Sequence, residues 1–107
     1  MNIEIKAKWL EALRSGKYLQ GKHLLRSKKD TYCCIGVLCE VAGLPWITNF
    51  TNFGDEYAAN GENTAVLPRS LEALVGLSPL NVAPLYRMND VEGKSFMEIA
   101  DYIEVNL

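Results

Sequence analysis

The segment that most constrains this chain is CCIGVLCEVAG at residues 33–43, in which Glu40 is the single charge among small and apolar side chains. Its apolar side chains point in every direction around a helix, and a helix that is apolar all round has to be buried. Gly43 is a typical stop for such a helix. Gly36 in its interior costs about 1 kcal/mol relative to alanine, so we expect another element to approach closely there. The sequence therefore predicts a buried central helix at 33–42.

Three other segments each carry one apolar stripe at helical spacing. They lie at about 6–15, 68–75 and 95–105. Ser95 and Glu98 form a capping-box pattern at the start of the last one. Because a single stripe must be buried against another element, these amphipathic helices are expected to pack around the central helix.

The remaining segments are less regular. HLLR at 23–26 and TYCC at 31–34 flank the polar turn SKKD, which predicts a small β-hairpin, with a loop leading into the next helix as the alternative. Residues 45–66 form the longest irregular stretch, with room for a short strand pair around ANGEN. Ser78 resembles the start of another helix, whose length Pro84 is expected to limit.

Together these elements predict a single domain, 1–107, of the α+β class, mainly α, with three or four amphipathic helices around the buried one. A hydrophobic fraction of 49% is ordinary for a globular protein. No apolar run is long enough for a membrane span, and the N-terminus lacks the apolar core of a signal peptide. Three cysteines, an odd number, fit a reducing compartment, so we expect a cytoplasmic protein and no membrane partner.

Charge is distributed unevenly along the chain. Residues 1–29 hold eight Lys and Arg against two Glu, whereas the remaining residues hold three Lys and Arg against eleven Asp and Glu. Such asymmetry indicates either a basic anion-binding surface or a basic third that packs beside the acidic remainder, and charge runs are more often solvated faces.

The segment KYLQGKHLLR gathers basic, aromatic and amide side chains within ten residues, a composition that suits phosphate or carboxylate binding. An exposed basic strand or loop is the structural alternative. RMNDVEGKS adds further polar groups, although Asn-Asp before Gly93 and Ser95 is also typical of a tight turn. The predicted ligand-binding residues are Lys17, Tyr18, Gln20, Lys22, His23, Arg26, Arg87 and Asn89.

The three cysteines allow a second reading, a cysteine hydrolase or transferase. Cys33 or Cys34 near a helix N-terminus would be the nucleophile, His23 its base, and Asn89 or Asp90 the group that orients the ring. Free cysteine is, however, among the most buried residue types. Packing is therefore favoured over catalysis, and a binding protein over an enzyme.

No metal or cofactor is predicted. The spacing C-C-x₄-C with one distant histidine does not match a zinc site, no P-loop frame is present, and the acidic residues at 49–63 lack calcium-loop spacing. With a pI near 5.4 and only two aromatic residues near the basic segment, a nucleic-acid partner is not favoured either.

Three motifs carry a resemblance: W-x₂-A-L-R-S-G-K-Y-x-Q-G at 9–21, Y-C-C-x-G-V-L-C at 32–39 and N-D-x-x-G-x-S-F-x-E-I-A at 89–100. They resemble those of a group of small uncharacterised proteins of phage and bacterial genomes. The resemblance implies a phage or mobile-element accessory protein that sequesters or inhibits a host factor, either an anionic small molecule such as a nucleotide signal of antiviral defence or a host protein. It assigns no catalytic residue.

Overall fold

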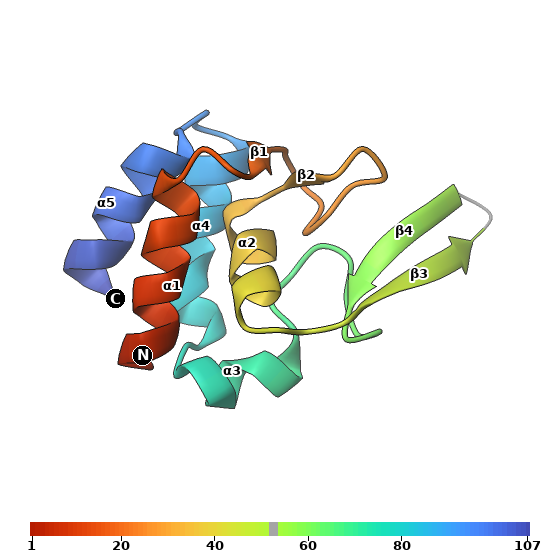
Figure 1. Ribbon diagram of the computed structural model, residues 1–107, viewed down its shortest axis with the longest axis horizontal. Coiled ribbons are helices and arrows are strands. Elements are labelled where there is room, and N and C mark those ends of the chain that lie inside the picture. The colour runs from red at the N-terminus through yellow and green to blue at the C-terminus, as the bar shows by residue number, and fades with distance from the viewer. Residues whose placement is uncertain (52–53) are drawn as a thin grey trace.

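The computed structural model describes residues 1–51 and 54–107, and the side chains of all described residues except 49–51 and 54–56. Helices dominate and the strands form two small sheets, so the predicted class, α+β and mainly α, is confirmed (Figure 1). In chain order the elements are α1 (Ile3–Arg14), β1 (Leu19–Gln20), β2 (Thr31–Tyr32), α2 (Cys34–Val41), β3 (Trp46–Thr51), β4 (Gly54–Ala59), α3 (Arg69–Val75), α4 (Pro79–Asp90) and α5 (Phe96–Asn106).

Helix α2 is the buried centre that the sequence predicts. It lies between α1 and α4 on one side and the β3–β4 hairpin on the other (Figure 1), and every residue from Cys34 to Cys39 is buried. Trp9 of α1 is itself fully buried and donates its indole N–H to the Cys34 carbonyl at 2.9 Å. This bond joins the first helix to the first turn of the central one.

The close approach expected at Gly36 is also present. A Cβ atom at this position would overlap the carbonyl oxygen of Leu25, a fully buried residue of the segment between β1 and β2. Only glycine therefore lets this segment lie directly against α2.

Helices α1, α3 and α5 match the three predicted amphipathic helices to within a few residues. The capping box is observed: Ser95 Oγ accepts from the Glu98 N–H, and the Glu98 carboxylate accepts from the Ser95 N–H. Gly76 ends α3 in the left-handed region, at φ +72°. Leu71 and Val75 occupy the core side of α3, whereas Leu74 is 55% exposed.

The prediction that Pro84 limits its helix is wrong. α4 continues through Pro84 to Asp90, and a capping box of Ser78 and Asn81 starts it. Proline removes only the N–H that the Leu80 carbonyl would have accepted, while burial of Val82 and Leu85 on the same helix favours its continuation.

As a consequence, Asn89 and Asp90 lie in the last turn of α4 and not in the tight turn that is the structural alternative for RMNDVEGKS. The chain turns after them, where Gly93 adopts φ +67°.

The predicted hairpin of 23–26 with 31–34 is observed only as a turn closed by one antiparallel bridge. β2 instead pairs in parallel with β1, and Arg26 contributes only an isolated antiparallel bridge to Tyr32. The observed hairpin is β3–β4, in the stretch expected to be irregular, and it projects from the helical body (Figure 1). The strand pair expected around ANGEN reduces to an isolated bridge between Ala59 and Asn63.

Candidate functional site

Asn89 is the one polar residue among the buried side chains of the described chain, at 1% exposure. Its Oδ1 accepts from Gln20 Nε2 at 2.9 Å and from the Cys34 N–H at 3.3 Å. Its Nδ2 donates to the Gly21 carbonyl and to Asp90 Oδ1, both at 2.8 Å. All four hydrogen-bonding positions of the amide are thereby used. Asn89 therefore positions its neighbours and has no capacity left for a ligand.

This network brings together three distant segments of the chain. Gln20 and Gly21 belong to the first of the three sequence motifs, Cys34 to the second, and Asn89 and Lys94 to the third. Gln20 Nε2 completes the junction by donating to the Lys94 carbonyl at 2.8 Å. The motifs thus meet at one place in the fold, the junction of β1, the start of α2 and the end of α4.

The loop after β1 is strained at this junction. His23 adopts φ +71°, and the Leu24 N–H donates to the Lys22 carbonyl at 2.9 Å, which is the pattern of a classic γ-turn. Such turns are rare and unfavourable for a residue with a side chain. Asp90 Oδ1 holds the turn by accepting from the His23 N–H at 3.0 Å. A strained backbone held by a buried network is a common property of binding and catalytic sites.

A cleft of about 280 Å³ opens beside this loop. It is lined by Gln20, Gly21, Lys22, Asn89, Gly93 and Lys94, and we call it the Lys22–Lys94 cleft. Lys22 is exposed, and Lys94 lies 3.7 Å from Glu98 in a partly solvated pair. The imidazole of His23 is also largely exposed, with Nδ1 3.8 Å from Asp90 Oδ2. Two lysines that line one small cleft suit the binding of an anionic group.

The other predicted ligand residues lie elsewhere. Lys17 and Tyr18 line a separate depression of about 300 Å³ against α1. Arg87 lines a groove between α4 and α5. The structure thus brings Gln20, Lys22 and Asn89 to one cleft, with His23 next to it, and divides the remaining residues among other surfaces.

Arg26 is held in an aromatic cluster. Its guanidinium lies 4.1 Å from the ring centre of Tyr57 and 5.7 Å from those of Tyr32 and Trp46. Asp30 Oδ1 accepts from Nε and from a terminal nitrogen of the same guanidinium, at 2.9 and 2.7 Å. These contacts satisfy Arg26 within the fold, and they connect the β3–β4 hairpin to the segment before β2.

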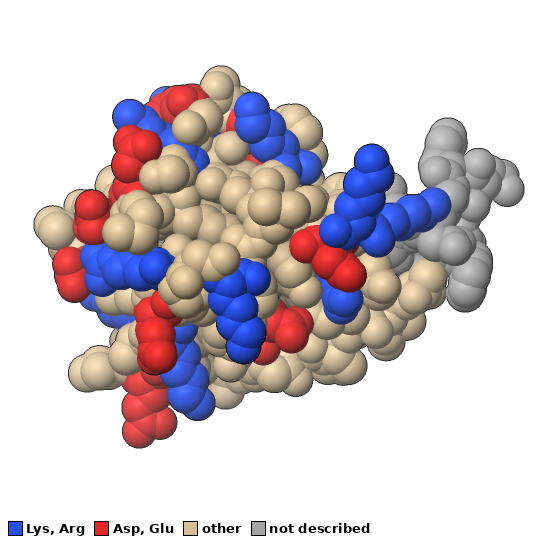
Figure 2. All heavy atoms as spheres, turned by 45° about the horizontal axis from the view of Figure 1, so that its top comes forward, with Lys and Arg blue, Asp and Glu red and all other residues tan. Residues whose placement is uncertain are grey.

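Charges of both signs are interspersed over the face drawn in Figure 2, and the basic N-terminal third does not form a separate basic half there. Arg14 of α1 pairs with Asp101 at 2.8 Å and with Glu104 at 3.3 Å, both on α5. For α1, the basic N-terminal third therefore packs beside acidic residues of the remaining chain, which is one of the two alternatives that the charge asymmetry indicates.

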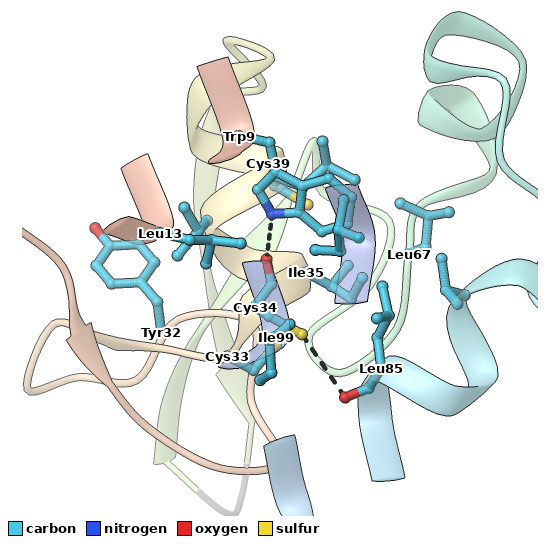
Figure 3. Packing of buried hydrophobic residues seen from close by; sticks show 14 of the residues in the cluster. Trp9, Leu13, Tyr32, Cys33, Cys34, Ile35, Cys39, Leu67, Leu85 and Ile99 are labelled. Atoms are coloured by element: carbon cyan, nitrogen blue, oxygen red, sulfur yellow. Dashed lines mark hydrogen bonds between the residues drawn. The ribbon is translucent and has the colours of Figure 1, made fainter. Parts of the chain in front are cut away.

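The cysteines lie in the core, and the expectation that they fill space there is confirmed (Figure 3). Cys33 Sγ accepts from the Gly36 N–H at the start of α2, and Cys34 Sγ donates to the Leu85 carbonyl at 3.7 Å. Burial raises the pKa of the Cys33 thiol to about 11 and also raises the pKa of the Cys34 and Cys39 thiols well above the ordinary value. These thiols are protonated and shielded at neutral pH, the opposite of an activated nucleophile.

The hypothesis of a cysteine hydrolase or transferase also requires His23 to act as the base for Cys33 or Cys34, and this contact is not observed among the described residues. The ring of His23 is 74% exposed and faces Asp90, and no hydrogen bond joins it to a cysteine in the described chain. Asp90 and Asn89 do lie beside His23, as that reading expected, but they hold its backbone loop.

Gly21, Gly93 and Lys94 line the cleft but are not among the predicted ligand-binding residues. Gly93 and Lys94 lie between Asp90 and Ser95, in a segment whose sequence is typical of a turn, and only their place in the lining of the same cleft as Lys22 gives them a role. The spacing of Lys94 next to a helix cap could not indicate this, because Lys22 is distant in the sequence.

Among residues 1–51 and 54–107, no three His, Cys, Asp or Glu side chains are grouped closely enough to hold a metal ion. None of the described helices has the length and apolar character needed to cross a membrane.

No curated protein and no solved structure matches this chain significantly. A protein-family model described as "Domain of unknown function (DUF8296)" matches residues 1–81, about three quarters of the chain. The match contains Gln20, Lys22 and Cys34 and ends before Asn89 and Lys94. The chain therefore belongs to the DUF8296 family of domains of unknown function.

Proposed function

We propose that this protein is a non-enzymatic binding protein that captures an anionic small molecule at the Lys22–Lys94 cleft. One observation carries the proposal: the strained γ-turn at His23 and the buried Asn89 network fix the wall of a cleft that two lysines line. Classic γ-turns at residues other than glycine are rare because they are strained, and strained backbone is concentrated at binding and catalytic sites.

Within this site the residues divide into two roles. Asn89 and the amide nitrogen of Gln20 are committed to internal hydrogen bonds, so they shape the cleft. Lys22, Lys94 and His23 present their side chains to solvent and supply the contacts to the ligand. The cleft is slightly smaller than a typical small-molecule pocket, so it suits one phosphoryl or carboxylate group with a part of the molecule that carries it.

The biological setting belongs to the same proposal. The three motifs that resemble phage and bacterial proteins meet at this cleft, which supports a phage or mobile-element accessory role. A nucleotide signal of host defence is the anionic ligand that such a role implies, and a cytoplasmic location follows from it. Capture of the ligand without chemistry is sufficient for this function.

The test is a calorimetric titration with inorganic phosphate and with linear and cyclic nucleotides. We expect at least one nucleotide to bind, and the double variant Lys22→Ala/Lys94→Ala to weaken its binding by about tenfold or more. The matched control is Lys28→Ala/Lys29→Ala, which removes the same charge from an exposed loop that lines none of the cavities described here. Equal weakening in the control, or unchanged binding in the cleft variant, would contradict the proposal.

A further inference from the structure

A second cavity lies on another part of the molecule, between the segment before α3, α3 itself and α4. It measures about 440 Å³, and none of its lining residues belongs to the Lys22–Lys94 cleft. Its apolar part is formed by Val66, Leu67, Pro68, Pro79 and Val82. Volume and lining are those of an ordinary small-molecule pocket, in which an apolar surface is combined with a few polar groups.

Tyr86 of α4 supplies one of those polar groups. Its hydroxyl accepts from the Leu67 N–H at 2.7 Å, and among the described residues none accepts the hydroxyl's own proton. Burial raises the pKa of Tyr86 to about 12, so the hydroxyl remains protonated at neutral pH. A hydrogen-bond donor is therefore available to a ligand at the wall of the cavity.

Charged groups of opposite sign lie at the same cavity. Arg69 and Glu72 are three residues apart on α3, a spacing at which two side chains can pair. Neither forms an ion pair with another described residue.

The third charge of the cavity, Glu62, is already satisfied. Its carboxylate accepts from the Ser70 N–H and hydroxyl and from Asn60 Nδ2. Glu62 keeps its negative charge, whereas Arg69, Glu72 and the hydroxyl proton of Tyr86 have no partner among the described residues, beside an apolar surface.

We propose that this cavity binds a small zwitterion with an apolar side chain, of the class of free hydrophobic amino acids. Arg69 and the Tyr86 hydroxyl hold its carboxylate, Glu72 holds its ammonium group, and the side chain lies against Val66, Leu67 and Val82. The argument is one of complementarity: a purely anionic or purely cationic ligand would leave one of the two α3 charges facing a like charge. The site is independent of the Lys22–Lys94 cleft and of the function proposed for it.

The test compares four probes by calorimetry or by NMR titration: L-leucine, L-phenylalanine, 3-phenylpropionate and 2-phenylethylamine. We expect the two amino acids to bind with a Kd of about 1 mM or lower, and the two analogues that lack one charge to bind at least tenfold more weakly. Equal binding of 3-phenylpropionate and phenylalanine, or no binding of either amino acid, overturns the proposal.

Variants locate the binding. Arg69→Gln and Glu72→Gln should each weaken phenylalanine binding about tenfold, whereas Arg87→Gln, which removes an exposed charge from a different groove, should not change it. Tyr86→Phe removes the acceptor of the Leu67 N–H and can disturb the fold. Val66→Trp is therefore the second variant, because Val66 is 46% exposed and its enlargement fills the cavity from the rim. Unchanged binding in Val66→Trp overturns the assignment of the site.

Discussion

At the scale of single residues, the fold depends on Asn89. Replacing it with alanine leaves the buried Cys34 N–H and the Gly21 carbonyl without their partner. Each unsatisfied buried group costs about 1–3 kcal/mol, so Asn89→Ala should lower the free energy of unfolding by about 3 kcal/mol in a urea titration. The control is Asn106→Ala on the exposed side of α5, which should change it by less than about 0.5 kcal/mol. If Asn89→Ala lowered the free energy of unfolding as little as Asn106→Ala does, water would have to form the hydrogen bonds of the missing amide.

The thiols give the pH dependence at the same scale. In the unfolded chain a cysteine titrates near pH 8.5, whereas burial raises the pKa of Cys33 to about 11 in the folded protein. Above about pH 8.5 the unfolded state therefore binds fewer protons than the native state, and stability falls as pH rises. At neutral pH the thiols are protonated in both the folded and the unfolded state, so they do not make the free energy of unfolding depend on pH.

We expect the free energy of unfolding to fall between pH 8 and pH 10, with a limiting slope of about 1.4 kcal/mol per pH unit for each buried thiol. Urea unfolding at half-unit steps of pH measures this. A Cys39→Ala variant retains two of the three thiols and should show a smaller slope. A slope that is the same in the variant would assign the pH dependence to other groups.

At the scale of elements, the contact between α2 and the segment before β2 depends on Gly36. An alanine Cβ there would overlap the Leu25 carbonyl, and backbone cannot move away as a flexible side chain can. Gly36→Ala should therefore cost more than about 3 kcal/mol and shift the urea midpoint accordingly.

Gly43→Ala is the matched control for this substitution. Its added Cβ meets no atom within 4 Å, but its φ of +81° makes alanine unfavourable by about 1–2 kcal/mol. If the two variants were equally destabilised, backbone conformation and not close packing would be the requirement at Gly36.

At the scale of the whole molecule, opposite charges connect the two ends of the chain. Arg14 on α1 faces Asp101 and Glu104 on α5, and Lys6 Nζ donates to the Glu104 carbonyl. Because these groups are solvated, their attraction is screened by salt. Arg14→Glu should lower Tm, and the loss should shrink in about 0.5 M NaCl, where screening acts within a few Å.

The control for this charge reversal is Lys28→Glu, which makes the same change in net charge in an exposed loop. It should lower Tm less than Arg14→Glu does at low salt. Equal and salt-independent losses would mean that the helix pair is joined by its apolar contacts alone. Differential scanning fluorimetry at two salt concentrations is sufficient for the comparison.

The candidate site was only partly accessible from the sequence. The residue types of KYLQGKHLLR predicted Gln20, Lys22 and His23 as ligand-binding residues, and the structure places them in or next to one cleft. Arg26 has the same charge as Lys22, yet it lies against the Tyr57 ring of the β3–β4 hairpin. The sequence did not predict this hairpin, because residues 45–66 are polar and have no clear strand pattern. Lys94 joins the site only because α4 ends beside β1.

What the sequence by itself determined is local. The buried α2 follows from an apolar run without a polar face, its tight contact from Gly36, and the start of α5 from Ser95 and Glu98, because periodicity and capping act within a few residues. What only the tertiary structure decided is long-range. α4 continues past Pro84 because burial of its apolar face outweighs one lost hydrogen bond, and Gln20, Cys34 and Asn89 meet because packing brings distant segments together. No local pattern encodes a contact between residues so far apart in the chain.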